Sequence, residues 1–212
     1  TIAFKKTKSW SDALYHLLFV LRMITIALIV VALARPQTHS ENAKTKITDG
    51  IDIVMAIDVS ASMLSQDLKP NRFEALKKVA SQFVKDRPND RIGLVIYAGE
   101  SYTKTPVTTD KSIILNALSE ITYGQIEDGT AIGMGLATAV NRLKESKAKS
   151  RVIILLTDGV NNTGFIDPQT AAELAAEYGI KVYTVGIGTN GMALSPYALN
   201  AAGSIIYRMQ QV

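Results

Sequence analysis

The sequence predicts an α/β protein with a doubly wound, mostly parallel sheet and one antiparallel edge strand, preceded by a transmembrane helix. Three observations support this prediction. Near-continuous apolar runs alternate with amphipathic stretches along most of the chain, which is typical of parallel strands covered by helices on both faces. One of these runs contains a proline, which an edge strand tolerates best. A much longer apolar stretch precedes them all.

The long apolar stretch, from Ala13 to Ala34, predicts a membrane-spanning helix. As a helix it is about 33 Å long, close to the thickness of a bilayer core. Trp10 and Tyr15 suit one membrane interface, and Arg35 stands before a proline that ends the helix. Arg22 lies near the middle and requires snorkelling or a neighbouring helix. A secretory signal peptide is the alternative, but its apolar core is usually shorter.

Basic residues around this helix predict its orientation. Lys5, Lys6 and Lys8 precede it, whereas Arg35 stands almost alone after it. Positive charge stays on the cytoplasmic side, so we expect the N-terminus in the cytoplasm and the large domain outside, in the periplasm of a bacterium. The expected organisation has four parts. These are a cytoplasmic flank at 1–12, a transmembrane helix at 13–35, a polar linker at 36–49 and a globular domain at 50–212.

The elements of the globular domain follow from the period of its apolar residues. Strands are expected at Ile51 to Ile57, Arg91 to Tyr97, Tyr102 to Val107, Arg151 to Leu156 and Lys181 to Gly186. Helices are expected at Asn71 to Lys85, from Lys111 onward, at Ala131 to Lys144 and at Pro168 to Tyr178. Asp110 and Asp167 are expected to cap two of these helices.

The first helix of the domain should bury an apolar face made of Phe73, Leu76, Val79, Ala80 and Phe83. The last stretch, SPYALNAAGSIIYRMQQV, predicts a β-hairpin arm, which leaves the domain without a closing helix. A short helix followed by a strand is the alternative.

Composition excludes several kinds of chemistry. The chain has no cysteine and only two histidines, His16 and His39, so thiolate chemistry and Ser-His-Asp catalysis lack their parts. The formal net charge of +4 is spread along 212 residues without a basic block. Nucleic acid is therefore not an expected partner.

Oxygen-bearing side chains gather where strands and helices are expected to meet. Asp58, Ser60 and Ser62 come at the end of the first strand or just after it. Thr130 is the last residue of the sequence DGT, which precedes a helix, and Asp158 follows the strand VIILLT. The functional crevice of a doubly wound sheet lies beyond the carboxyl ends of its strands. Each motif alone is commonly a turn or a cap, but together they predict a site for one hard cation. Mg²⁺ suits these donors best, with Mn²⁺ or Ca²⁺ as alternatives.

The pattern DVSAS, then Thr130, then Asp158 resembles the metal-ion-dependent adhesion site (MIDAS) of the von Willebrand factor A (VWA) domain. The resemblance covers Gly50 to about Gly188 and fills all five positions of the pattern. It implies that Ser60, Ser62 and Thr130 coordinate the metal directly. Asp58 and Asp158 would hold waters and hydroxyl groups around it.

A second resemblance is to the bacterial membrane-anchored BatA/BatB-type proteins linked to aerotolerance. ALARPQ, Ala32 to Gln37, and VYTVGIGTNGMA, Val182 to Ala193, are similar to that branch. This resemblance implies an inner-membrane protein working in an envelope complex. Its partners would be similar Bat-type membrane proteins and a MoxR-type AAA+ ATPase.

The leading hypothesis is a non-enzymatic, metal-dependent protein-binding module. Three neutral hydroxyl ligands leave much of the charge of Mg²⁺ uncompensated, so a Glu or Asp of a partner protein would complete its coordination. A magnesium-dependent phosphotransferase with Asp58 as nucleophile is one alternative, but Ser60 stands where a second aspartate is required. A GK[ST] phosphate loop is also missing. A structural domain with a vestigial site is the other alternative.

Several neighbouring residues are given ordinary structural roles. Solvated surface is expected for Asp67, Asp90 and Glu127, although each could modulate the rim of the crevice. Asn161 and Asn162 are expected in the turn after Asp158. Three glycines, Gly129, Gly133 and Gly135, are expected to allow close packing of a helix against the sheet.

Overall fold

The computed structural model describes residues 10–34, 50–200 and 203–211. The chain divides into two units, Thr1–Lys46 and Ile47–Val212. The first contains α1 (Trp10–Ala34), in which Ala13–Ala34 is long and apolar enough to cross a membrane by length and composition, with a mean hydropathy of 2.8. The expected flank up to residue 9, and the linker at 36–49, lie outside the described residues.

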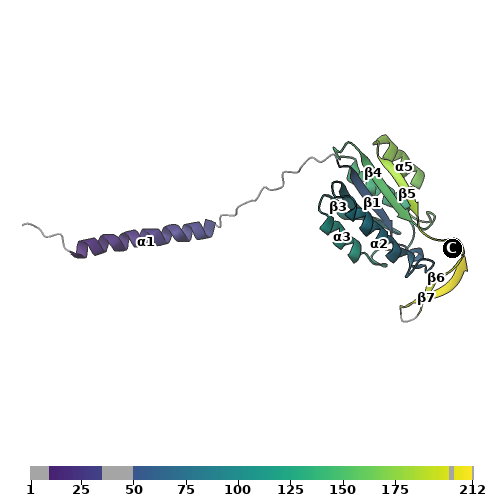
Figure 1. Cartoon of the computed structure of the whole chain (residues 1–212), viewed down its shortest axis with the longest axis horizontal. Coiled ribbons are helices and arrows are strands. Elements are labelled where there is room, and N and C mark those ends of the chain that lie inside the picture. The colour runs from purple at the N-terminus through teal and green to yellow at the C-terminus, as the bar shows by residue number, and fades with distance from the viewer. Residues whose placement is uncertain (1–9, 35–49, 201–202, 212) are drawn as a thin grey trace, which may run out of the picture. The chain divides into compact units, whose positions relative to one another are not determined.

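The second unit is built on a five-stranded sheet in the order β3-β2-β1-β4-β5 (Figure 1). The strands are β1 (Asp52–Asp58), β2 (Arg91–Tyr97), β3 (Ser101–Thr108), β4 (Arg151–Thr157) and β5 (Lys181–Gly186). All neighbouring pairs are parallel except β2 and β3. The predicted fold class, with its antiparallel edge strand, is confirmed.

Alternate residues of β1 enter two separate cores, as the period of a strand requires. Ile53, Met55 and Ile57 pack with α2 (Arg72–Lys85) and α3 (Lys111–Glu120), whereas Val54 and Ala56 pack with α4 (Ile132–Leu143) and α5 (Pro168–Glu177). Each face of the sheet is therefore covered by two helices.

Local signals place the helices as expected. The Asp110 carboxylate accepts hydrogen bonds from the backbone N–H groups of Ser112 and Ile113, and Asp167 does the same for Gln169 and Thr170. These caps satisfy donors that a helix leaves unpaired at its start.

Close packing of α4 is confirmed at Gly133 and Gly135, the two predicted glycines that lie within this helix. A Cβ on Gly133 would lie 1.9 Å from the Ile166 carbonyl oxygen, and one on Gly135 would lie 2.5 Å from the Tyr97 ring. A larger residue at either position would push α4 away from its neighbours.

The prediction for α2 is wrong at one position, because Val79 is exposed. It lies at the margin of the buried stripe, beside a surface groove that also includes Phe83, Tyr183 and Val185. This side of β4 and β5 has no helix over it within the described residues.

The predicted hairpin is confirmed. β6 (Met192–Leu199) and β7 (Ile205–Gln211) form a separate two-stranded antiparallel sheet. β6 contacts η1 (Ala61–Leu64), a single 3₁₀ turn that follows β1. This turn was not predicted from the sequence.

Candidate metal centre

The candidate site lies at the carboxyl ends of β1 and β4, the two central strands. β1 pairs with β4 as far as Ile57 and Leu156, so the next residues of both strands reach the same edge of the sheet. Strand order reverses between β1 and β4, because β2 lies on the other side of β1. This is the switch point at which doubly wound sheets bind ligands.

Three of the predicted residues are linked by direct hydrogen bonds. The Ser60 and Ser62 hydroxyl oxygens are 3.0 Å apart, and the Ser62 hydroxyl donates to Asp158 Oδ1 at 2.7 Å. Asp58 lies beneath them and is fully buried. Its Oδ1 accepts from the Ser60 N–H at 2.9 Å, and its Oδ2 accepts from the Thr157 hydroxyl at 2.8 Å.

The loop that carries Thr130 is joined to the same segment. Asp128 Oδ1 accepts a hydrogen bond from the N–H of Ala61, the residue between the two serines, at 2.9 Å. Thr130 itself is buried, and its backbone N–H and C=O both bond to Asn162, at 2.9 and 3.0 Å. Asn162 therefore holds the Thr130 loop against the turn that follows Asp158, a role beyond the simple turn expected for it.

The spacing of the hydroxyl oxygens fits a small octahedral cation. Ligands about 2.1 Å from Mg²⁺ and at right angles to each other lie about 3.0 Å apart. The Ser60 and Ser62 oxygens have this separation. Asn161, in the turn after Asp158, has a buried side-chain oxygen without a hydrogen-bond partner.

Among the described residues, no three Asp, Glu, His or Cys side chains are grouped as in a metal site made of such ligands alone. The site here differs because hydroxyl groups supply most of its converging oxygens. Ser60 and Ser62 are hydroxyl groups that could hold a cation here together with Thr130, and Asp58 and Asp158 could balance its charge.

Burial raises the pKa of Asp58 from 3.8 to about 6. Hydrogen bonds from Ser60 and Thr157 oppose this effect, and the nearby charge of Asp158 adds to it. Two carboxylates brought together away from water repel each other. A divalent cation between them and the hydroxyl groups would relieve that repulsion.

Arg72 is a second, unpredicted feature of the site. Its guanidinium donates from Nη1 to Asp158 Oδ2 and from Nε to Asp67 Oδ1, both at 2.8 Å. The side chains are 7%, 0% and 3% exposed for Arg72, Asp158 and Asp67. Each oxygen of Asp158 is therefore engaged, one by Ser62 and the other by Arg72.

The expectation that Asp67 is solvated is wrong. Burial acts to raise the pKa of Asp67, but the hydrogen bonds from Arg72 and from the Thr189 N–H have the larger combined effect. The pKa of Asp67 therefore lies below its ordinary value. Asp90 is likewise not free surface, because its Oδ1 accepts from the Ile51 N–H at 3.0 Å. Arg72 begins α2 two residues after Pro70, and nothing in this local sequence indicates that it pairs with Asp67 and Asp158.

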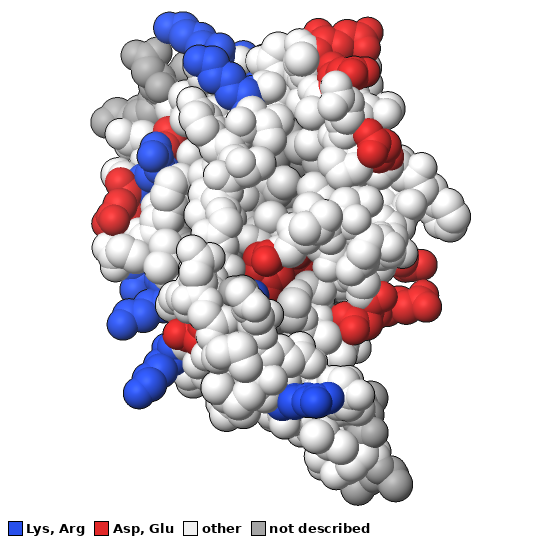
Figure 2. Space-filling model, turned by 90° about the vertical axis from the view of Figure 1, so that its right-hand side faces the viewer, with Lys and Arg blue, Asp and Glu red and all other residues white. Residues whose placement is uncertain are grey.

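A cleft of about 640 Å³ opens beside the hydroxyl groups. Ser62 and Asp158 line it on one side, and Ser195, Pro196 and Gln210 of the hairpin line it on the other. Figure 2 shows acidic atoms recessed near the middle of a face whose surroundings are mostly uncharged. The site is thus open to a ligand from outside.

The parallel sheet covered by helices, with hydroxyl and carboxylate oxygens grouped at its switch point, defines a doubly wound α/β domain with a crevice site. The chain belongs to the von Willebrand factor type A domain family, whose model matches residues 52–204. The predicted family is therefore confirmed.

Solved structures of two bacterial relatives resemble the chain closely. An aerotolerance-related membrane protein from Bacteroides fragilis is 31% identical, with a TM-score of 0.66 over 76% of this chain and 82% of that one. BatB from Bacteroides thetaiotaomicron is 34% identical, with the same TM-score over 76% of this chain and 80% of that one. The resemblance to the Bat-type branch is confirmed.

Proximal thread matrix protein 1 of the mussel byssus, solved with zinc in its MIDAS motif, is a more distant neighbour. It is 28% identical, with a TM-score of 0.56 over 65% of this chain and 35% of that one. An uncharacterized protein of Borreliella burgdorferi is 34% identical over 83% of this chain and 50% of its own length. The chain spans about half the length of the first curated relatives that it matches.

The buried Asp58 predicts a specific pH dependence. The pKa of Asp58 is about 6 in the metal-free fold and 3.8 in the unfolded chain, so the fold binds this proton more tightly. The resulting stabilisation is complete below pH 3.8 and is lost as pH rises through about 6. Asn cannot titrate. Denaturant unfolding in EDTA should therefore show Asp58→Asn gaining roughly 2 to 3 kcal/mol relative to wild type between pH 4 and pH 7. A constant difference would contradict the assigned burial.

Arg72→Gln should destabilise the metal-free fold by about 3 to 5 kcal/mol, because it leaves two buried carboxylates without a cation. Lys104→Gln provides the control, since Lys104 pairs with a largely exposed Glu120 and should cost under about 1 kcal/mol. Urea unfolding measures both. Equal losses in the two variants would show that the buried ion pairs do not stabilise the domain.

Proposed function

We propose that this protein is a membrane-anchored, metal-dependent protein-binding module. The observation that carries the proposal is the hydrogen-bonded group of Ser60, Ser62 and Asp158 at the switch point. Family membership and the zinc-occupied MIDAS of the mussel protein support it. Mg²⁺ is the proposed ion, because the donors are hard oxygens with the spacing that it prefers.

Each residue of the site has a proposed part. Ser60, Ser62 and Thr130 would hold the cation through hydroxyl oxygens. Asp58 fixes the Ser60 backbone, and Asp158 orients the Ser62 hydroxyl. Bound Mg²⁺ would supply a hard Lewis acid beside the cleft that Ser62 and Asp158 line. A Glu or Asp carboxylate from a partner protein is the ligand that such a centre favours.

The geometry gives little support to the phosphotransferase alternative. A nucleophilic aspartate needs a free oxygen that faces the substrate. Asp58 is fully buried, and both its oxygens already accept hydrogen bonds, from Ser60 and Thr157. A binding role therefore explains the same residues better.

The membrane assignment extends this proposal. α1 can span a bilayer by length and composition, and the Bacteroides fragilis relative is described as a membrane protein. We place the protein in the inner membrane of a bacterium with the VWA domain in the periplasm. Its proposed partners are other Bat-type membrane proteins and, on the cytoplasmic side, a MoxR-type AAA+ ATPase.

Metal binding is tested by calorimetry and unfolding of the full chain in detergent. At Mg²⁺ a hundredfold above its dissociation constant, wild type should gain about 2.7 kcal/mol of stability. Ser62→Ala should weaken Mg²⁺ binding at least tenfold, because a hydroxyl ligand is lost. Ser119→Ala removes an exposed hydroxyl of α3 and should bind Mg²⁺ as wild type does. Equal Mg²⁺ affinity in all three proteins would reject the assigned site.

Topology is tested by adding protease to spheroplasts that express the chain with an epitope at its C-terminus. We expect external protease to remove the epitope, because the positive-inside rule places the domain in the periplasm. Lysed spheroplasts show that the tag can be cleaved. Protection of the tag in intact spheroplasts would place the domain in the cytoplasm.

A further inference from the structure

We propose that the partner docks over an apolar rim on both sides of the metal centre, so that its acidic residue lies within an apolar segment. The apolar rim consists of Val160 and Phe165 on the β4–α5 loop and Met192, Leu194 and Met209 on the hairpin. This inference rests on the proposed function and specifies the partner that the site would accept.

The loop side of the rim is fixed next to the metal centre. Val160 comes two residues after Asp158, and Phe165 follows Gly164, where a Cβ would lie 2.8 Å from the Ala131 Cβ. Ala131 is the residue after Thr130. Two hydrogen bonds hold the loop in this place, from the Thr130 N–H to Asn162 Oδ1 and from the Asn162 N–H to the Thr130 carbonyl oxygen. Its two apolar side chains nevertheless face solvent, at 83% for Val160 and 100% for Phe165.

The hairpin side is fixed by the segment that follows η1. The Ser65 hydroxyl donates to the Ser195 hydroxyl, and the Gln66 N–H donates to the Leu194 carbonyl oxygen, both at 2.9 Å. Ala193 and Ser195 are buried as a result, and alternation along β6 turns Met192 and Leu194 outward. Leu194 is paired with Met209 across the hairpin, and the three side chains are 62%, 41% and 52% exposed for Met192, Leu194 and Met209.

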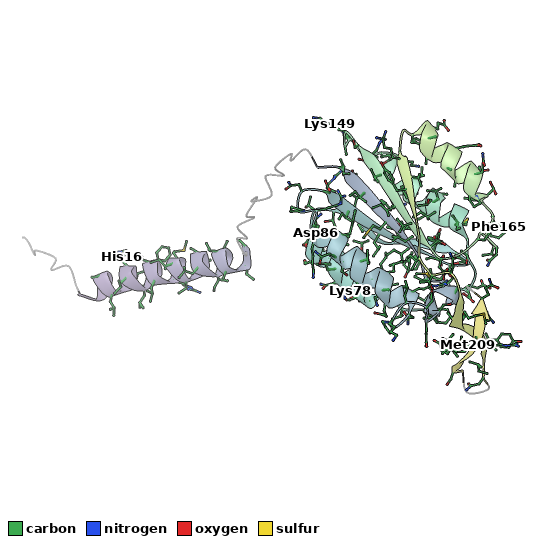
Figure 3. All side chains as sticks on the ribbon, turned by 45° about the vertical axis from the view of Figure 1, so that its right-hand side comes forward. His16, Lys78, Asp86, Lys149, Phe165 and Met209 are labelled. Atoms are coloured by element: carbon green, nitrogen blue, oxygen red, sulfur yellow. The ribbon has the colours of Figure 1, made fainter. Side chains whose placement is uncertain are left out.

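One cleft joins the hairpin to the metal centre, because Ser62 and Asp158 line it together with Ser195 and Pro196. Figure 3 labels Phe165 and Met209, which both project from the part of the domain where β1 and β4 end. The rim flanks the cleft rather than lining it, because Val160 follows the cleft residue Gly159 and Leu194 precedes the cleft residue Ser195. A partner that fills the cleft and extends past its edges therefore meets apolar side chains. Exposed apolar groups beside a binding site are typical of protein interaction surfaces.

Charge favours the same kind of partner. Among the described residues that line the cleft, Arg72 and Asp158 are the only charged ones, and they are paired with each other. An incoming carboxylate would therefore find its counter-charge only at the metal. The other described residues of the cleft are uncharged, and the apolar rim flanks it. Additional charged groups on the partner would therefore lose water without gaining an ion pair.

The test pans a phage-displayed library of random twelve-residue peptides against the full chain in detergent with Mg²⁺, eluting with EDTA. Enriched peptides should carry one Glu or Asp with apolar residues within a few positions of it. Affinities for one such peptide are then measured for wild type, Phe165→Ser and Met209→Ser. Ile113→Ser is the matched control, since Ile113 is 48% exposed on α3 and outside the rim.

We expect Phe165→Ser and Met209→Ser each to weaken peptide binding at least tenfold, with Mg²⁺ affinity unchanged and Ile113→Ser like wild type. Chelator-sensitive binding that survives both rim substitutions would overturn this inference and leave the proposed function intact. Enriched peptides without the acidic and apolar pattern would also overturn it. Binding that persists in EDTA, or a library that yields no chelator-sensitive peptide, would contradict the proposed function itself.

Discussion

The structure depends on placing two carboxylates, Asp58 and Asp158, at the ends of neighbouring buried strands. Removing acidic groups from water is costly unless they are paired or hydrogen-bonded. Asp58 is satisfied by Ser60 and Thr157, and Asp158 by Ser62 and Arg72. The polypeptide around the switch point is therefore organised by the need to satisfy these two acids.

This constraint connects the fold to the proposed function. The Ser62 hydroxyl that satisfies Asp158 also contacts the Ser60 hydroxyl. Asp128 holds the loop that carries these two serines, and Asn162 holds the loop of Thr130. Arg72 extends the network to Asp67, whose other oxygen accepts from the N–H of Thr189, just before the hairpin. The same hydrogen bonds thus position the candidate metal ligands and the surface that a partner would meet.

Much of the fold could be predicted from the sequence because its signals are local. β2 and β5 begin and end where the apolar runs do, and Asp110 and Asp167 cap helices in the expected way. The candidate site residues were predicted by combining motifs with a rule about parallel sheets. Their metal-binding roles stay a prediction.

The parts of the fold and of the candidate site that could not be predicted depend on contacts between residues far apart in the sequence. Arg72 reaches Asp158 across 86 positions, and Ser65 reaches Ser195 across 130, so no local period reveals either contact. Asp67 was assigned to solvent because lone acids usually are exposed, whereas a buried arginine pairs with it here. Val79 fits the helical period of α2, but its side chain is exposed. It lies at a surface groove that no helix covers among the described residues.

The most direct measurement is a crystal structure of the chain grown with Mn²⁺, with anomalous data collected at the manganese edge. The account predicts one peak about 2.2 Å from the Ser60 and Ser62 hydroxyl oxygens, with the Thr130 hydroxyl as a third ligand. A crystal soaked at saturating Mn²⁺ without a peak there, or with the ion held elsewhere by surface carboxylates, would contradict it.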